Sequence, residues 1–182
     1  MKTYLTIYTD GACHSGINAR GAINKGGFGV VIFNEDGLLI RMLHNHTENT
    51  TNNREELKAI QCALQEWEHM ASITDGELSA IIYSDSAYCV NIFNSWMESW
   101  CANGWTRSGG KPIENLDIIQ SIYDNYNKNF LRGQVELRKV KGHADNLGNL
   151  LADALATGDS KKVEKLIGRN PQILGGNIND II

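Results

Sequence analysis

The sequence predicts an α/β fold, in which a five-stranded mixed sheet combines an antiparallel meander with parallel strands and carries helices on both faces. Two observations predict it. Three strand-like segments rich in β-branched and aromatic residues follow one another before any helical pattern begins. Later strand-like segments alternate with helical ones, as is typical of parallel strands joined by helices. The 182 residues are enough for one domain with its own core.

The first three strands are predicted to form the meander. Residues 3–9 alternate and are rich in Thr and Tyr, and this strand is expected to stop at Asp10. The stretch 11–25 contains Gly, Asn and Ser without a period, which predicts a loop. Residues 27–33 and 38–44 are predicted as the second and third strands, on either side of a tight turn.

Helices and buried strands are predicted to follow. Asn52 is a predicted N-cap, with Glu55 three residues later in a capping-box pattern. The apolar run 80–83 predicts a strand buried on both faces, which ends beside Asp85. The remaining predictions, in order, are helical pattern to about residue 102, a Gly-rich loop over 103–112, a helix over 114–127, a strand over 134–140 and a helix over 148–156.

The domain organisation is predicted to be simple. Residues 1–158 form one domain, and 159–182 form a C-terminal tail with a short helical pattern. The four cysteines are too widely spaced to indicate a zinc site or a disulfide framework. No apolar run approaches the length of a membrane span, so we expect a soluble, cytoplasmic protein with no membrane association.

The charge balance argues against wholesale coating of a polyanion. The chain has 17 basic and 21 acidic residues, a formal net charge of −4. Proteins that hold nucleic acid by bulk electrostatics usually present a strongly basic face. A local nucleic-acid site is still compatible with this total.

Two aspartates stand where predicted strands end. Asp10 follows the first strand and Asp85 follows the buried fourth one. Ligands of open α/β sheets gather at the carboxyl ends of strands, so the pair is more informative than either residue alone. The alternative is that each Asp serves turn or cap chemistry.

Two further carboxylates are predicted to point inward from helices. Glu56 lies within roughly 40° of the apolar positions of its helix, whereas Glu55 is about 100° away and is expected to face solvent. Asp153 is the charged residue of an apolar helix, one turn after Asn149. If Asp10, Asp85 and these two converge, they form a hard-oxygen site suited to Mg²⁺ or Mn²⁺.

These carboxylates belong to a set of motifs that resembles the type 1 ribonuclease H family in order and spacing, over about residues 2–157. The motifs are Thr-Asp-Gly-Ala-Cys at 9–13, Thr-Asn-Asn-Arg-Glu-Glu-Leu at 51–57, Tyr-Ser-Asp-Ser at 83–86, Val-Lys-Gly-His-Ala at 140–144, and Asp153. The resemblance implies a ribonuclease H-like fold. It also implies an endonuclease that hydrolyses the RNA strand of an RNA–DNA hybrid and leaves 5′-phosphate and 3′-hydroxyl ends.

The resemblance assigns roles to individual residues. It implies that Asp10, Glu56, Asp85 and Asp153 are catalytic and bind two Mg²⁺ ions, for which Mn²⁺ can substitute, and that His143 is a catalytic histidine suited to proton shuttling. The substrate-binding residues that it implies are Cys13, Thr51, Asn52, Asn53, Trp100, Trp105 and Asn149. The segment 101–111 contains only two basic residues, Arg107 and Lys111, where many relatives carry a dense basic cluster.

Two other functions fit parts of the pattern. An integrase- or transposase-like DNA strand transferase would use a related carboxylate cluster, but the Thr-Asn-Asn and Gly-His motifs favour a hybrid hydrolase. A non-catalytic hybrid-binding module would be expected to lack one of the carboxylates, and all four are present. We expect a monomer whose partner is the hybrid duplex.

Overall fold

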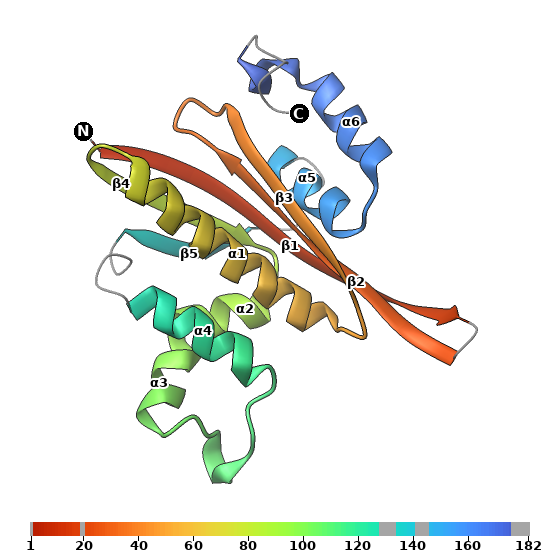
Figure 1. Cartoon of the computed structure of the whole chain (residues 1–182). Helices are drawn as coiled ribbons and strands as arrows, with labels where there is room; N and C mark the ends of the chain where they lie inside the picture. The colour runs from red at the N-terminus through yellow and green to blue at the C-terminus, as the bar shows by residue number, and fades with distance from the viewer. Residues whose placement is uncertain (1, 19–20, 128–133, 141–145, 176–182) are drawn as a thin grey trace.

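The computed structural model describes residues 2–18, 21–127, 134–140 and 146–175. Its centre is a five-stranded sheet with the order β3-β2-β1-β4-β5 (Figure 1). The strands are β1 Lys2–Asn18, β2 Gly21–Phe33, β3 Leu39–Glu48, β4 Glu77–Ser84 and β5 Val135–Lys139. The first three pair antiparallel, while β4 pairs parallel with both β1 and β5. The predicted mixed sheet is confirmed.

Helices cover both faces of this sheet, as predicted. The helical elements are α1 Asn52–Ile73, α2 Ala87–Asn91, the π-helical η1 Ile92–Trp96, α3 Met97–Ala102, the 3₁₀ turn η2 Ser108–Gly110, α4 Leu116–Asn127, α5 Leu147–Ala156, α6 Ser160–Arg169 and the 3₁₀ turn η3 Pro171–Leu174. The layer of α1 and α4 lies across the sheet from α5 and α6 (Figure 1). Two separate apolar clusters result, one around Trp67 and one around Leu151.

Glycines in the sheet allow two helices to approach its backbone closely. A Cβ at Gly11 would overlap the backbone nitrogen of Glu56 in α1. A Cβ at Gly29 would overlap the carbonyl oxygen of Ala152 in α5. Only glycine leaves room for such contacts, so both helices are held against β1 and β2 at a fixed distance.

The prediction that residues 11–25 form a loop is wrong. β1 continues to Asn18, β2 begins at Gly21, and the two remain paired from Cys13–Gly26 to Asn18–Gly21. Backbone hydrogen bonds sustain this ladder, and they need no alternation of apolar side chains. The resulting hairpin projects beyond the helices (Figure 1).

The predicted tail contains folded structure. Asp159 caps α6, where its Oδ1 accepts a hydrogen bond from the Lys162 backbone nitrogen at 2.9 Å. Apolar residues of α6 and η3 pack on the second cluster, which includes Phe33 of β2. Ile173 is 6% exposed there. Residues 160–174 therefore extend the layer that α5 begins.

All four cysteines are free thiols, which agrees with the absence of a disulfide framework from the sequence pattern. Among the described residues, no helix has both the length and the apolar character needed to cross a membrane.

Candidate active site

The parallel pairing of β1 with β4 places two carboxylates side by side. Thr9 of β1 is the register partner of Ser84, the last residue of β4, so Asp10 and Asp85 are adjacent at the end of this pair. The Thr9 hydroxyl donates a hydrogen bond to the Tyr83 carbonyl oxygen at 3.1 Å. Asp10 is buried and Asp85 is exposed. Asp10 therefore lies on the inner side of one site, and Asp85 lies at its opening.

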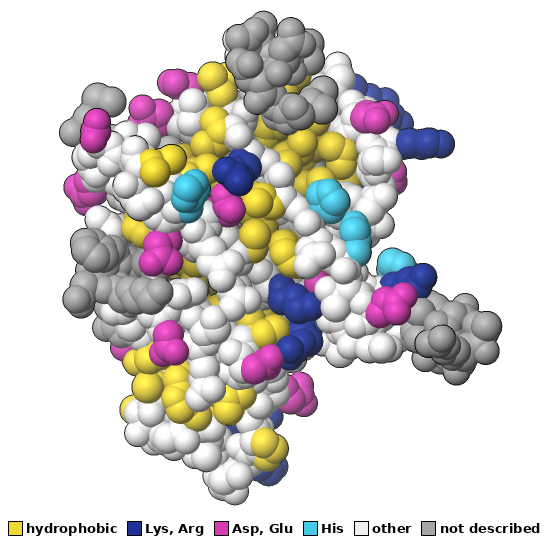
Figure 2. Space-filling model, in the orientation of Figure 1, with side chains coloured by type: hydrophobic (Ala, Val, Ile, Leu, Met, Phe, Trp, Pro, Cys, Tyr) yellow, Lys and Arg dark blue, Asp and Glu magenta, His cyan; other side chains and the backbone are white. Residues whose placement is uncertain are grey.

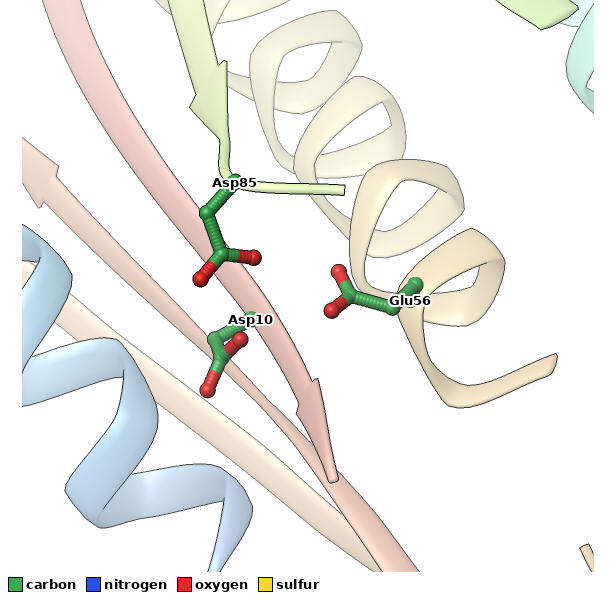
Figure 3. Close-up of side chains that lie close together, drawn as sticks. All are labelled: Asp10, Glu56 and Asp85. Carbon is green, nitrogen blue, oxygen red and sulfur yellow. The ribbon is translucent and has the colours of Figure 1, made fainter. Parts of the chain in front are cut away.

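The first turn of α1 adds a third carboxylate. Glu56 is 7% exposed and lies over Gly11, where the glycine lets the helix approach β1. One ligand oxygen from each of Asp10, Glu56 and Asp85 lies within 4.8 Å of the other two. Figure 3 shows these carboxylates pointing toward one another from β1, α1 and the residue after β4. Glu56 Oε2 is buried and has no hydrogen-bond partner among the described residues.

The start of α1 differs from the prediction in two details. Thr51, not Asn52, is the N-cap, and its hydroxyl accepts a hydrogen bond from the Arg54 backbone nitrogen at 3.3 Å. Glu55 is fully buried, so the prediction that it faces solvent is wrong. Its Oε1 accepts hydrogen bonds from the Thr50 hydroxyl and the Lys58 ammonium, both at 2.6 Å. Because Lys58 compensates this charge, Glu55 can be buried without joining the carboxylate group.

Asp153 lies on the opposite wall of the same cleft. It projects from α5 and lines, with Asp10, Glu56 and Asp85, a cleft of about 580 Å³. It is not in the group of three whose ligand oxygens lie within 4.8 Å of one another. Its Oδ2 instead forms an ion pair with Lys162 Nζ of α6 at 2.5 Å. The four predicted carboxylates thus share one cleft, three of them in close contact.

Burial and mutual repulsion disfavour ionisation of the two buried carboxyls. Desolvation, followed by the charges of Asp85 and Asp153, raises the pKa of Asp10 to about 7. Desolvation, followed by the charges of Asp10 and Asp85, raises the pKa of Glu56 to about 9. A divalent cation between these oxygens would favour their ionised form and so offset both the burial and the mutual repulsion. The donor set and the unpartnered Glu56 oxygen therefore fit a hard divalent ion.

Several predicted substrate-binding residues surround the carboxylates. Cys13, Asn52 and Asn149 line the cleft, and Thr51 and Asn53 lie exposed beside it at the start of α1. Cys13 Sγ donates a hydrogen bond to the Thr50 carbonyl oxygen at 3.3 Å. Asn149 Oδ1 is buried and has no hydrogen-bond partner within the described ranges.

The two predicted tryptophans lie outside this cleft. Trp100 lines a second hollow with Trp96, Arg107, Ser108 and Lys111, and its ring lies 5.7 Å from that of Trp96. Figure 2 shows hydrophobic side chains gathered on the surface over α3. Trp105 makes an edge contact with Tyr123, with ring centroids 5.2 Å apart. His143 lies outside the described residues, so its predicted role stays a prediction.

The structure also shows two cleft neighbours that sequence reasoning missed. His14 lines the cleft beyond Cys13 because β1 continues past Asp10. Lys162 reaches Asp153 because α6 starts directly after α5. The cap residue Asp159, three positions before Lys162, was the signal in the sequence for this helix.

Comparison with known proteins identifies the family. The family model described as RNase H matches residues 2–161. The chain belongs to the ribonuclease H family. Relatives named ribonuclease H include that of Chlorobium phaeobacteroides strain BS1, 37% identical over 158 residues, with 86% of this chain and 95% of the relative covered. The ribonuclease H of Caldanaerobacter subterraneus subsp. tengcongensis is 36% identical over 166 residues, which cover 91% and 94% of the two chains.

Solved structures agree with this family. The crystal structure of a type 1 ribonuclease H with the type 2 active-site motif has a TM-score of 0.67 and 29% identity to this chain, covering 88% of this chain and 74% of that one. A foamy viral protease-reverse transcriptase solved with an RNA/DNA hybrid has a TM-score of 0.69 and 21% identity, covering 85% and 19%, which is a likeness in fold. The resemblance to type 1 ribonucleases H is thereby confirmed.

Proposed function

We propose that this enzyme cleaves the RNA strand of an RNA–DNA hybrid at the cleft that holds Asp10, Glu56, Asp85 and Asp153. The convergence of three carboxylates within 4.8 Å in a member of the ribonuclease H family carries the proposal. Two structures of the same fold, the foamy viral enzyme and a protein named LC11-RNase H1, are complexes with an RNA/DNA hybrid. Their shared fold supports a duplex substrate for this cleft.

The carboxylates would hold two Mg²⁺ ions, or Mn²⁺ in their place. Such ions supply activation of the attacking water and stabilisation of the leaving 3′-oxygen during in-line displacement. Asp10 and Glu56 give the buried side of the site, and Asp85 and Asp153 the side that faces the cleft opening. The close approach of α1 and α5 to glycines of the sheet fixes where Glu56 and Asp153 lie relative to β1 and β2. His143 is proposed to accept or return a proton near the product.

The residues at the start of α1 are proposed to recognise the hybrid. The Asn52 and Asn53 side chains carry amide groups able to meet base edges and a 2′-hydroxyl, the group that distinguishes RNA from DNA. Thr51 keeps its capping hydrogen bond while its exposed side lies beside them. Trp100 and Trp105 are proposed to support the DNA strand of the hybrid, with Arg107 and Lys111 as the basic contacts of that strand.

Asp85→Asn provides the test, because Asp85 is exposed and its replacement leaves the buried part of the site in place. With a hybrid labelled on the RNA strand and Mg²⁺, we expect cleavage to fall by at least about 100-fold, because loss of a residue that only supports a metal ligand already costs about 10- to 100-fold. Asp124→Asn, on an exposed position of α4, is the matched control and should cleave as the parent does. Unchanged cleavage by Asp85→Asn would overturn the proposal.

The same assay separates the alternatives. A DNA strand transferase would act on duplex DNA, and a binding module would hold the hybrid without cutting it. We propose residues 1–158 as the catalytic domain, residues 159–182 as an extension, and a monomer as the active form. Gel filtration coupled to light scattering measures the last point directly.

A further inference from the structure

A lysine ammonium contacts one carboxylate of the proposed metal site. Lys162 Nζ lies 2.5 Å from Asp153 Oδ2, with the two side chains 37% and 42% exposed. The positive charge of Lys162 also lowers the pKa of Asp10, against the stronger upward effect of burial. One cation of this chain therefore acts on two of the four carboxylates.

The position of this ammonium is fixed by folded structure. The Asp159 backbone nitrogen donates to the Ala154 carbonyl oxygen at 2.8 Å, which turns the chain directly from α5 into α6. The Asp159 side chain then accepts from the Lys162 backbone nitrogen at 2.9 Å. Val163, next to Lys162, packs on the apolar cluster under the helix. A capped helix that packs on the sheet thus places Lys162 beside Asp153.

Lys162 lies just beyond the segment that the family model matches, which ends at residue 161. Lys161 is exposed, while Lys162 is half-buried and turns toward the cleft. Lys161 and Lys162 therefore carry the same charge, but only Lys162 contacts Asp153, so Lys161 is a natural control position.

We propose that Lys162 is a positioning residue that serves as a counter-ion for Asp153, and that a divalent ion on the Asp153 side of the site must displace it. The inference rests on the proposed function, because it takes the four carboxylates as the metal site. An ammonium and a divalent cation cannot share one carboxylate oxygen at contact distance without strong repulsion. Lys162 thereby sets the ion concentration at which the metal position on the Asp153 side fills.

Removal of the ammonium should strengthen metal binding. Mn²⁺ is the probe, titrated into the full-length protein without nucleic acid and followed by calorimetry and by the electron paramagnetic resonance signal of free Mn²⁺. We expect Lys162→Met to bind the weaker Mn²⁺ ion about 3- to 10-fold more tightly, since a partly exposed ion pair is lost together with a like-charge repulsion.

Three controls isolate the contact. Lys161→Met removes the same charge from an exposed position and should stay within about twofold of the parent at 0.1 M salt. Lys162→Arg keeps the charge and should also stay close to the parent. In an Asp153→Asn background, Lys162→Met should no longer change Mn²⁺ affinity, because the partner of the ammonium is gone.

Equal Mn²⁺ affinity for Lys162→Met and Lys161→Met, or weaker binding by Lys162→Met, would overturn the inference. That outcome is distinguishable from failure of the proposed function, which is decided by cleavage with Asp85→Asn. The inference can therefore fail while Asp85→Asn still abolishes cleavage.

Discussion

Asp10→Asn is expected to stabilise the metal-free protein at alkaline pH. The reason is the cost of ionising a buried carboxyl, whose pKa is raised from the ordinary value of 3.8 to about 7. Between these two values the folded state holds a proton that the unfolded chain releases. The free energy of unfolding therefore falls as the pH rises through this window, and the loss is complete above about pH 7.

The size of the effect follows from that difference. A pKa change from 3.8 to about 7 corresponds to about 4 kcal/mol of lost stability at pH 8. Asparagine avoids the charge but its amide also loses hydration, so we expect a gain of about 2–4 kcal/mol. For a chain of this size, that gain raises the melting temperature by about 5–15 °C. At pH 5 most of the parent Asp10 is already protonated in the folded state, so about 3 kcal/mol of the gain disappears and at most about 1 kcal/mol remains.

Thermal and urea unfolding in a chelator, at pH 5 and pH 8, measure these gains. Asp124→Asn is the control, because it removes one carboxylate from an exposed position of α4. Addition of Mg²⁺ at pH 8 should stabilise the parent more than Asp10→Asn, and so reduce the difference between their free energies of unfolding. A gain of the same size at both pH values, or a loss of stability at pH 8, would refute the reasoning.

Two further predictions concern packing. Gly11→Ala should destabilise the protein by about 2–4 kcal/mol and weaken cleavage, because the added methyl group overlaps the Glu56 backbone. Gly168→Ala is the control, since a methyl group there meets open space, and it should leave the free energy of unfolding unchanged or raise it by up to about 1 kcal/mol. Similar urea midpoints for these two variants would contradict the close contact. Ile173→Ala should cost about 2–4 kcal/mol of unfolding free energy with little change in cleavage rate, since Ile173 packs on the second apolar cluster and does not line the cleft of the carboxylates. An unchanged urea midpoint would mean that η3 does not cover the sheet.

The order of elements and the inward direction of Glu56 could be predicted because each depends on local patterns. Apolar runs identify buried strands, and the angular position of Glu56 relative to its apolar neighbours identifies the buried face of α1. The ends of strands then predict where Asp10 and Asp85 meet, and the register confirms it.

The errors come from partners that are distant in sequence. Residues 11–18 become strand because β2 is available to pair with them along their whole length. Glu55 becomes buried because Thr50 and Lys58 both reach it, which a helical wheel of apolar positions does not register. The ion pair of Asp153 likewise depends on how α6 packs against α5, and a spacing of nine residues does not indicate it.

The distribution of the carboxylates along the chain has a consequence for folding. They come from β1, α1, the residue after β4, and α5, so none of the corresponding fragments contains the whole site. An ion that needs all of these segments binds the native state and leaves the unfolded chain alone. At a concentration 100 times its dissociation constant, such an ion adds about 2.7 kcal/mol to the free energy of unfolding. At a saturating ion concentration, metal occupancy therefore reports the fraction of folded molecules.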